Sequence, residues 1–220
     1  MIITIGRESA SRPQKIYHKD NFLYLPIQKN ASSWGIDFFS NIKWDEILLN
    51  DSVKQDQFIM DKNIIVFLRH PMDRWYSAVA EYFSALDYTT EDNEYILDEK
   101  ILNLIFDAVR IDGHSDLQIK WLLGLHLNKC TFFNIGDPLF EYKLHRFLHQ
   151  KKLTTKLQPL SKFKPTHTTN INFMKTTIIK QLKQHAENKP YLLHNISAFY
   201  RPDFELFYWL SNNQLFFKVD

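Results

Sequence analysis

Two short segments of the chain carry side chains that suit the binding of anions. The first is PIQKNASSW, residues 26–34, where Lys29, Ser32 and Ser33 stand between an apolar run and an amphipathic stretch. An ammonium group, hydroxyls and the free N–H groups of a helix start are the groups that hold phosphate-like anions. The segment lacks the GxxxxGK[ST] pattern, which disfavours a purine triphosphatase.

The second segment is RHPMDRWYS, residues 69–77. Arg69 follows an apolar run directly, and Pro71 is suited to the first position of a helix. The apolar stripe of that helix leaves Ser77 on another face. An arginine at the end of a strand can bind a phosphate through the N–H groups of its planar guanidinium, and the Ser77 hydroxyl can add a hydrogen bond.

The elements that position these segments follow from the apolar pattern. Three near-continuous apolar runs predict buried strands at 21–27, 63–68 and 130–135, with Met1–Ile5 as a further edge strand. Helical stripes cover 75–86, 101–109, 117–125 and the chain from 171 onward, with a break at Arg201-Pro202 and a polar loop at 151–169. The alternation predicts an α/β fold with a small central parallel sheet and right-handed crossovers. Ligands of such folds bind at the carboxyl edge of the sheet.

Composition narrows the class of protein. The 220 residues are 45% hydrophobic and 24% charged, which fits one globular domain, residues 1–220. The net charge of +2 favours a small anionic ligand over nucleic acid. Cys130 is the single cysteine, so a disulfide framework is not expected. Without an apolar run of about 18 residues or a signal-peptide pattern, we expect a soluble, cytoplasmic protein with no membrane span.

Together the two segments resemble those of the PAPS-dependent sulfotransferases (PAPS is 3′-phosphoadenosine 5′-phosphosulfate), especially the carbohydrate branch. Residues 26–34 resemble the family's PK-x-(A/G)-(S/T)-(S/T) segment, although the spacing from Pro26 to Lys29 is longer than in the common form. Residues 69–77 match R-(D/N/H)-P-x-x-R-x-x-S. Residues 112–118 look like an H-x-x-x-Q segment, and residues 199–207 look like a C-terminal Y-x-x-D-F-E-L-F signature.

The resemblance implies a P-loop-like three-layer fold and a role for each matching residue. Lys29 would bind the 5′-phosphosulfate, and Arg69 and Ser77 the 3′-phosphate. The remaining PAPS-binding residues would include Asn30, Ala31, Ser32 and Ser33. Trp34 would either face the adenine or lie in the core. Lys164 and His167 would lie in a loop that closes over the nucleotide. No metal is required in such a site.

The sequence indicates the general base and the acceptor less closely than it indicates the PAPS-binding residues. His114 is our candidate base because it matches the family segment and because imidazole titrates near neutral pH. Glu46 and Glu81 are the rivals. The carbohydrate branch implies a sugar hydroxyl as acceptor. Two alternatives stay open: a nucleotide-dependent kinase with Asp137 as its Mg²⁺ ligand, and a catalytically inactive, sulfotransferase-like binding protein.

Overall fold

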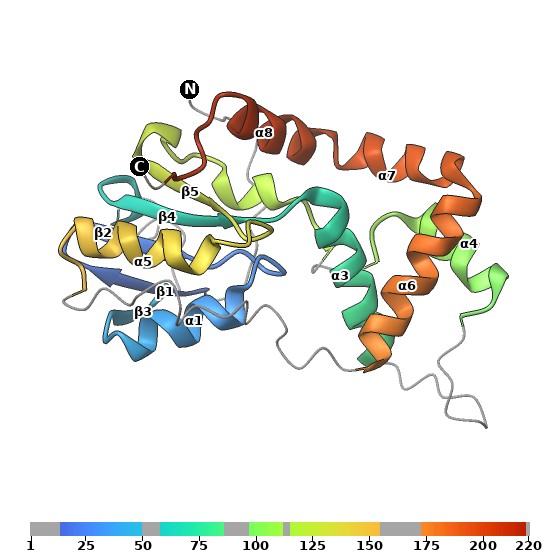
Figure 1. The fold of residues 1–220 in the computed structure, drawn as a ribbon, viewed down its shortest axis with the longest axis horizontal. Helices are drawn as coiled ribbons and strands as arrows, with labels where there is room; N and C mark the ends of the chain where they lie inside the picture. The colour runs from blue at the N-terminus through green and yellow to red at the C-terminus, as the bar shows by residue number, and fades with distance from the viewer. Residues whose placement is uncertain (1–13, 50–57, 86–96, 112–114, 155–172, 219–220) are drawn as a thin grey trace. The chain divides into compact units, whose positions relative to one another are not determined.

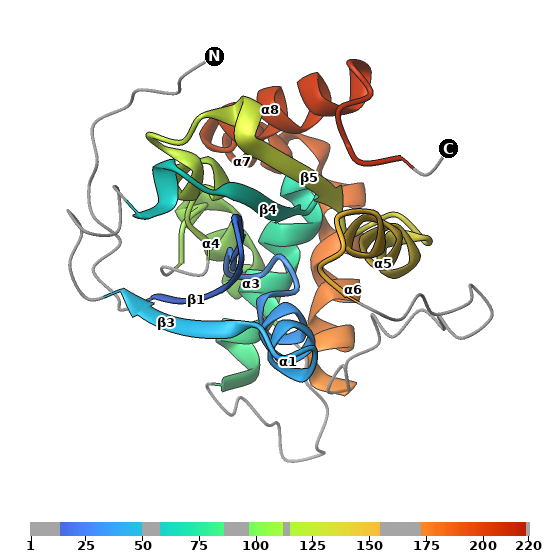
Figure 2. The ribbon, with the colours of Figure 1, turned by 90° about the vertical axis from the view of Figure 1, so that its left-hand side faces the viewer.

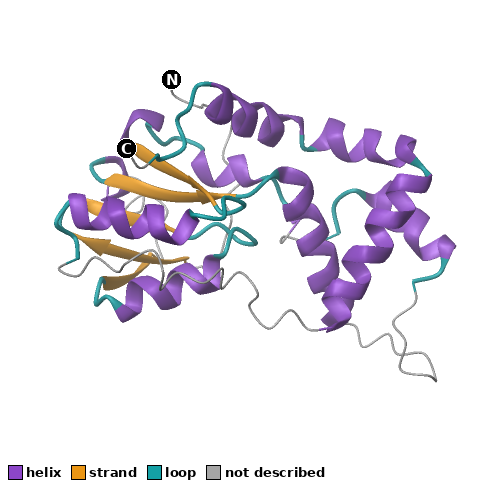
Figure 3. Ribbon diagram, viewed as in Figure 1, coloured by secondary structure: helices purple, strands orange, loops and turns teal. Residues whose placement is uncertain are grey.

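The computed structural model describes residues 14–49, 58–85, 97–111, 115–154 and 173–218 (Figure 1). These residues cluster into two compact units. The first takes its described residues from 1–69, 118–165 and 208–220, and the second from 70–117 and 166–207. All the described strands belong to the first unit, and the second is helical (Figure 3).

The first unit is built on a five-stranded mixed sheet in the order β3-β1-β2-β4-β5. Strands β2, β4 and β5 are parallel, while β1 runs antiparallel to both of its neighbours, β2 and β3. The bounds are β1 (Gln14–Lys19), β2 (Phe22–Leu25), β3 (Asp45–Leu49), β4 (Asn63–Leu68) and β5 (Cys130–Asn134). The α/β class is therefore confirmed. The sheet that we expected to be parallel is mixed.

Two helices, α1 (Ser32–Asn41) and α5 (Phe140–Gln150), cover one face of this sheet (Figure 2). Their contact with the sheet is largely aromatic. Phe39 of α1 stacks on Tyr24 at 4.5 Å between ring centroids, and Phe140 of α5 meets Phe67 edge-on at 4.8 Å. Each such pair contributes about 0.5–1.5 kcal/mol beyond the area that it buries. This packing fixes α1, and with it the loop that precedes α1, against the strands.

Gly35 allows the first turn of α1 to approach β2. A Cβ atom at this position would fall on the Tyr24 hydroxyl and 2.5 Å from Tyr24 Cζ. The Tyr24 side chain is fully buried and cannot move aside cheaply. A glycine is needed here because of the close approach of helix and strand.

The second unit packs its helices around a separate core. Its elements are α3 (Pro71–Ala85), α4 (Glu99–Ala108), α6 (Phe173–Asn188), α7 (Leu193–Phe199) and the start of α8 (Arg201–Asn212). The first part of the stripe predicted on α3 is buried: Trp75 and Val79 join Phe106, Leu182 and Tyr200 in the core. The predicted helix at 117–125 is replaced by a short 3₁₀ helix, η2 (Gln118–Leu122). None of the described helices is long and apolar enough to cross a membrane.

Candidate functional site

The Lys29 loop, residues 26–31, joins the carboxyl end of β2 to α1. Lys29 and Ala31 both have left-handed backbones, with φ of 64° and 55°. Ala31 is the N-cap of α1 and supplies no capping side chain. The first helical bond runs from Gly35 N to Ala31 O at 2.8 Å. The amides of Ser32 and Ser33 therefore precede the helical ladder, which is the arrangement that binds anions at a helix start.

Asn30, in the middle of this loop, points into the protein. Its side chain is fully buried, and Nδ2 donates to Phe67 O of β4 at 2.9 Å. The same Nδ2 also donates to Gln118 Oε1 at 2.9 Å. Asn30 thus attaches the loop to the neighbouring strand, while Lys29 and Ala31, on either side of it, are partly exposed.

Gln118 connects this loop to the second anion segment. Its side chain is fully buried, and Nε2 donates to Arg69 O at 3.0 Å. Its Oε1 accepts from Arg69 N at 3.4 Å in addition to Asn30 Nδ2. Arg69 is the first residue after β4, which is the parallel neighbour of β2. The structure therefore brings the Lys29 loop and Arg69 to the same edge of the sheet.

The sequence did not reveal these two buried amides as connectors. Asn30 was predicted to supply a backbone donor to PAPS; its backbone N–H donates to Ile27 O at 3.1 Å, and its Nδ2 also bonds within the protein. Gln118 was noted only as part of a motif. The available signal was an uncharged polar residue directly before a stretch, residues 119–123 (IKWLL), that is apolar except for Lys120, which favours a buried and paired amide.

Trp34 and Ser77 belong to different units. The Trp34 ring stacks on Phe38 at 5.0 Å and lies 5.3 Å from Phe140, so it is part of the aromatic cluster. Ser77 lies on α3 in the second unit and is partly exposed. Its role at the 3′-phosphate stays a prediction. Lys164 and His167 lie outside the described residues.

Of the three candidate bases, Glu46 is a poor proton acceptor. Its carboxylate accepts from the Tyr17 hydroxyl at 2.7 Å and pairs with Lys15 at 2.9 Å. The hydrogen bonds from Lys15 and Tyr17 lower the pKa of Glu46 below its usual value. A lower pKa makes the carboxylate a weaker base. Glu46 is better suited to fixing β3 against β1 than to catalysis.

Glu81 is also engaged, since its carboxylate pairs with Lys175 of α6. This ion pair joins two helices of the second unit. His114 lies outside the described residues, so its role stays a prediction.

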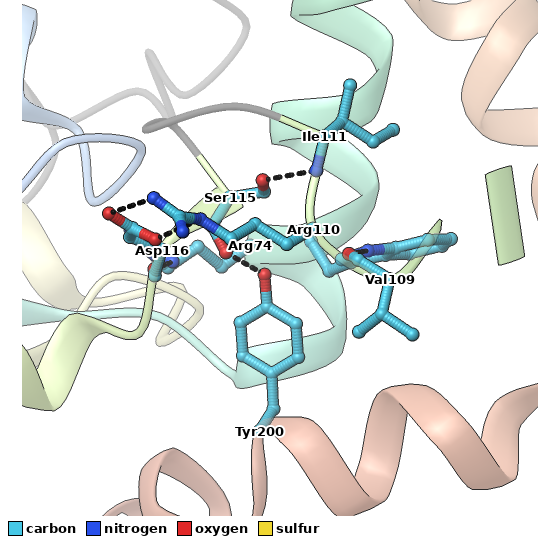
Figure 4. Close-up of polar contacts among 8 residues, drawn as sticks. Arg74, Val109, Arg110, Ile111, Ser115, Asp116 and Tyr200 are labelled. Atoms are coloured by element: carbon cyan, nitrogen blue, oxygen red, sulfur yellow. Dashed lines mark hydrogen bonds and ion pairs between the residues drawn. The ribbon is translucent and has the colours of Figure 1, made fainter. Parts of the chain in front are cut away.

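The residues on both sides of 112–114 are held in place by the second unit (Figure 4). The buried Arg74 guanidinium donates to Asp116 O, and the Tyr200 hydroxyl donates to Ser115 O. Ser115 Oγ accepts from Ile111 N at 2.9 Å. Arg74 belongs to the 69–77 segment and Tyr200 to the C-terminal segment 199–207, and here both hold the backbone next to the candidate base.

Asp137, the kinase-type candidate, follows β5 and is used locally. One carboxylate oxygen accepts from Leu139 N at 2.8 Å, and the other pairs with Lys143 of α5. These bonds fix the start of α5 and disfavour a Mg²⁺ ligand at this position. Within the described ranges, no three His, Cys, Asp or Glu side chains gather where they could hold a metal ion.

Comparison with models of protein families, with curated proteins and with solved structures found no match to this chain. A function is therefore inferred from its own residues and their geometry.

Proposed function

We propose that this protein transfers a sulfuryl group from PAPS to an acceptor hydroxyl on a carbohydrate and releases PAP (3′-phosphoadenosine 5′-phosphate). The observation that carries the proposal is the hydrogen-bonded link from Asn30 through Gln118 to Arg69. It keeps a lysine-containing helix start beside an arginine at one edge of a sheet, as a ligand with an anion at each end requires.

The proposed fold is a P-loop-like three-layer arrangement. Strands β2 and β4 are adjacent and parallel, and their carboxyl ends lead into the two anion segments. Ligand loops at the carboxyl ends of adjacent parallel strands are typical of open α/β folds.

In the proposed reaction the acceptor oxygen attacks sulfur in line, while the bond from sulfur to the bridging phosphate oxygen breaks. The electron pair stays on that oxygen of PAP, where Lys29 and the amides of the helix start stabilise the charge. The acceptor proton passes to a general base, for which His114 is the candidate. Arg69, Ser77 and Lys164 would bind the rest of the nucleotide.

Calorimetric titration with PAP, ATP and ADP, with and without Mg²⁺, tests this function. We expect PAP to bind with an affinity that does not depend on Mg²⁺. Tight binding of Mg·ATP with no response to PAP would refute the sulfotransferase and favour the kinase. If PAP binds but radiolabelled PAPS transfers no sulfuryl group to a mixture of glycans, the chain is an inactive binding protein.

A further inference from the structure

On the side of β4 that faces β2, the last residues bond to two side chains instead of to the neighbouring strand. The β2–β4 ladder ends at Leu25 and Val66. The next carbonyl of β4, Phe67 O, receives its hydrogen bond from Asn30 Nδ2 at 2.9 Å. A side chain of the loop thus bonds to β4 just beyond the end of the backbone ladder.

Gln118 extends the same strand by one more residue. Its amide donates to Arg69 O and accepts from Arg69 N, as the N–H and C=O of one residue in an adjacent antiparallel strand would. Because Gln118 Oε1 also accepts from Asn30 Nδ2, one buried carboxamide bonds to both anion segments. We call the Asn30 and Gln118 side chains, with the Arg69 backbone, the carboxamide clasp.

From these bonds we infer that Gln118 is a positioning residue, which sets the separation between the Lys29 loop and Arg69. The inference rests on the proposed function, in which these two segments hold opposite ends of one nucleotide. The covalent frame of PAP fixes the distance between its two anionic groups. Two segments held at the matching distance bind both groups with little ordering cost, whereas segments that move independently lose this advantage.

A positioning role of Gln118 is distinguished from a merely structural role by comparing the affinities for a ligand with two anionic groups and for ligands with one. In Gln118→Met, which keeps the approximate volume but removes the hydrogen bonds, we expect PAP affinity to fall about tenfold, or ~1.4 kcal/mol. Affinity for 5′-AMP and 3′-AMP should change less than about twofold, because each segment alone keeps its own groups. Equal losses for all three ligands, or no loss for PAP, would overturn the inference.

A matched control separates the clasp from general loss of stability. Asn103→Leu removes a part-buried hydrogen bond, 2.9 Å long, between Asn103 Oδ1 and His185 Nε2 in the second unit. This variant should bind PAP and both monophosphates with wild-type affinity. A loss of PAP affinity equal to that of Gln118→Met would show that removing any such amide weakens the site, and the inference would fail.

Amide hydrogen exchange without ligand tests the coupling independently of PAP. In Gln118→Met, the backbone N–H groups of Arg69 and Asn30 should both exchange about tenfold faster, while the backbone N–H of Val66 inside β4 keeps its rate. Faster exchange at Arg69 alone would show that the clasp does not couple the two segments. If the wild type binds no PAP, the proposed function fails, and exchange still decides whether the coupling exists.

Discussion

At the scale of single residues, the two exposed ends of α1 offer an internal comparison. Lys29 before the helix and Lys43 after it both have left-handed backbones, with φ of 64° and 59°. They have the same charge and lie in the same unit. Only Lys29 stands at the amino end of the helix, where backbone N–H groups and the helix dipole attract anions.

We therefore expect Lys29→Ala to lower sulfuryl transfer at least 100-fold, because it removes the charge that stabilises the leaving phosphate oxygen. Lys43→Ala should transfer at the wild-type rate. Initial rates with radiolabelled PAPS measure both variants. Comparable activity in the two would mean that the reaction does not use the amino end of α1.

The candidate bases differ in what their removal should change. His114→Ala should lower turnover about 100- to 10,000-fold and remove the rise of the rate with pH below about 6.5, as expected for an imidazole base. Glu46→Gln and Glu81→Gln should keep the wild-type pH profile, because both carboxylates are held in ion pairs. If His114→Ala keeps the wild-type pH profile, or if either Gln variant loses the rise of the rate with pH, a residue other than His114 is the base.

Glu46 should instead affect stability in acid. Its folded-state pKa is lowered by Lys15 and Tyr17, so the carboxylate stabilises the fold above the usual glutamate pKa of about 4.3. That contribution is lost as the pH falls through the lowered pKa. The stability difference between wild type and Glu46→Gln, measured by urea unfolding across this range, should therefore be largest at neutral pH and vanish in acid.

At the scale of elements, the contact between α1 and β2 depends on Gly35. Gly35→Ala should destabilise the protein by about 1–3 kcal/mol, because the added Cβ meets the buried Tyr24 ring. Tyr24→Phe removes a buried hydroxyl that has no partner among the described residues, so this change should be neutral or stabilising. The double variant should recover part of the Gly35→Ala loss.

Gly136→Ala is the matched control for this contact. Gly136 is exposed, and a Cβ there would come no closer than 3.2 Å to the Asn134 side chain. Its unfolding free energy should lie within about 0.5 kcal/mol of the wild type. A Gly35→Ala protein as stable as this control would show that α1 shifts away from β2 at little cost.

The sequence predicted the parts of the fold that are buried on both faces. Strands β2, β4 and β5 are apolar runs, and each was expected within two residues of its observed bounds. Strands β1 and β3 each contain only two or three adjacent apolar residues, and they form an antiparallel pair in which Tyr17 and Glu46 face each other. A pattern of so few residues does not separate such strands from loops.

The candidate site was predictable to a similar extent. Lys29 and Arg69 follow apolar strands, and that position alone brings them to one edge of a parallel pair. The clasp joins residues 30, 69 and 118, which are far apart in the chain, and pairing among distant polar side chains cannot be deduced from local spacing. The identity of the general base depends on residues outside the described ranges.

At the scale of the whole molecule, the chain passes between the two units several times, yet each unit has its own core. The first core contains Phe39, Phe67 and Phe140, and the second contains Trp75 and Phe106. No residue is shared between these two described clusters. Clusters of this kind define regions that open independently in native-state hydrogen exchange.

Phe106→Ala, which removes a fully buried ring from the second core, should destabilise that unit by about 3–5 kcal/mol. We expect faster amide exchange throughout α3, α4 and α6, while β2, β4 and β5 keep their wild-type rates. Phe39→Ala should produce the reverse pattern, because it acts on the core beneath the clasp. PAP affinity should fall in Phe39→Ala, since Lys29 and Arg69 both belong to the first unit. Equal acceleration of exchange in both units by either variant would mean that the two cores unfold as one cooperative structure.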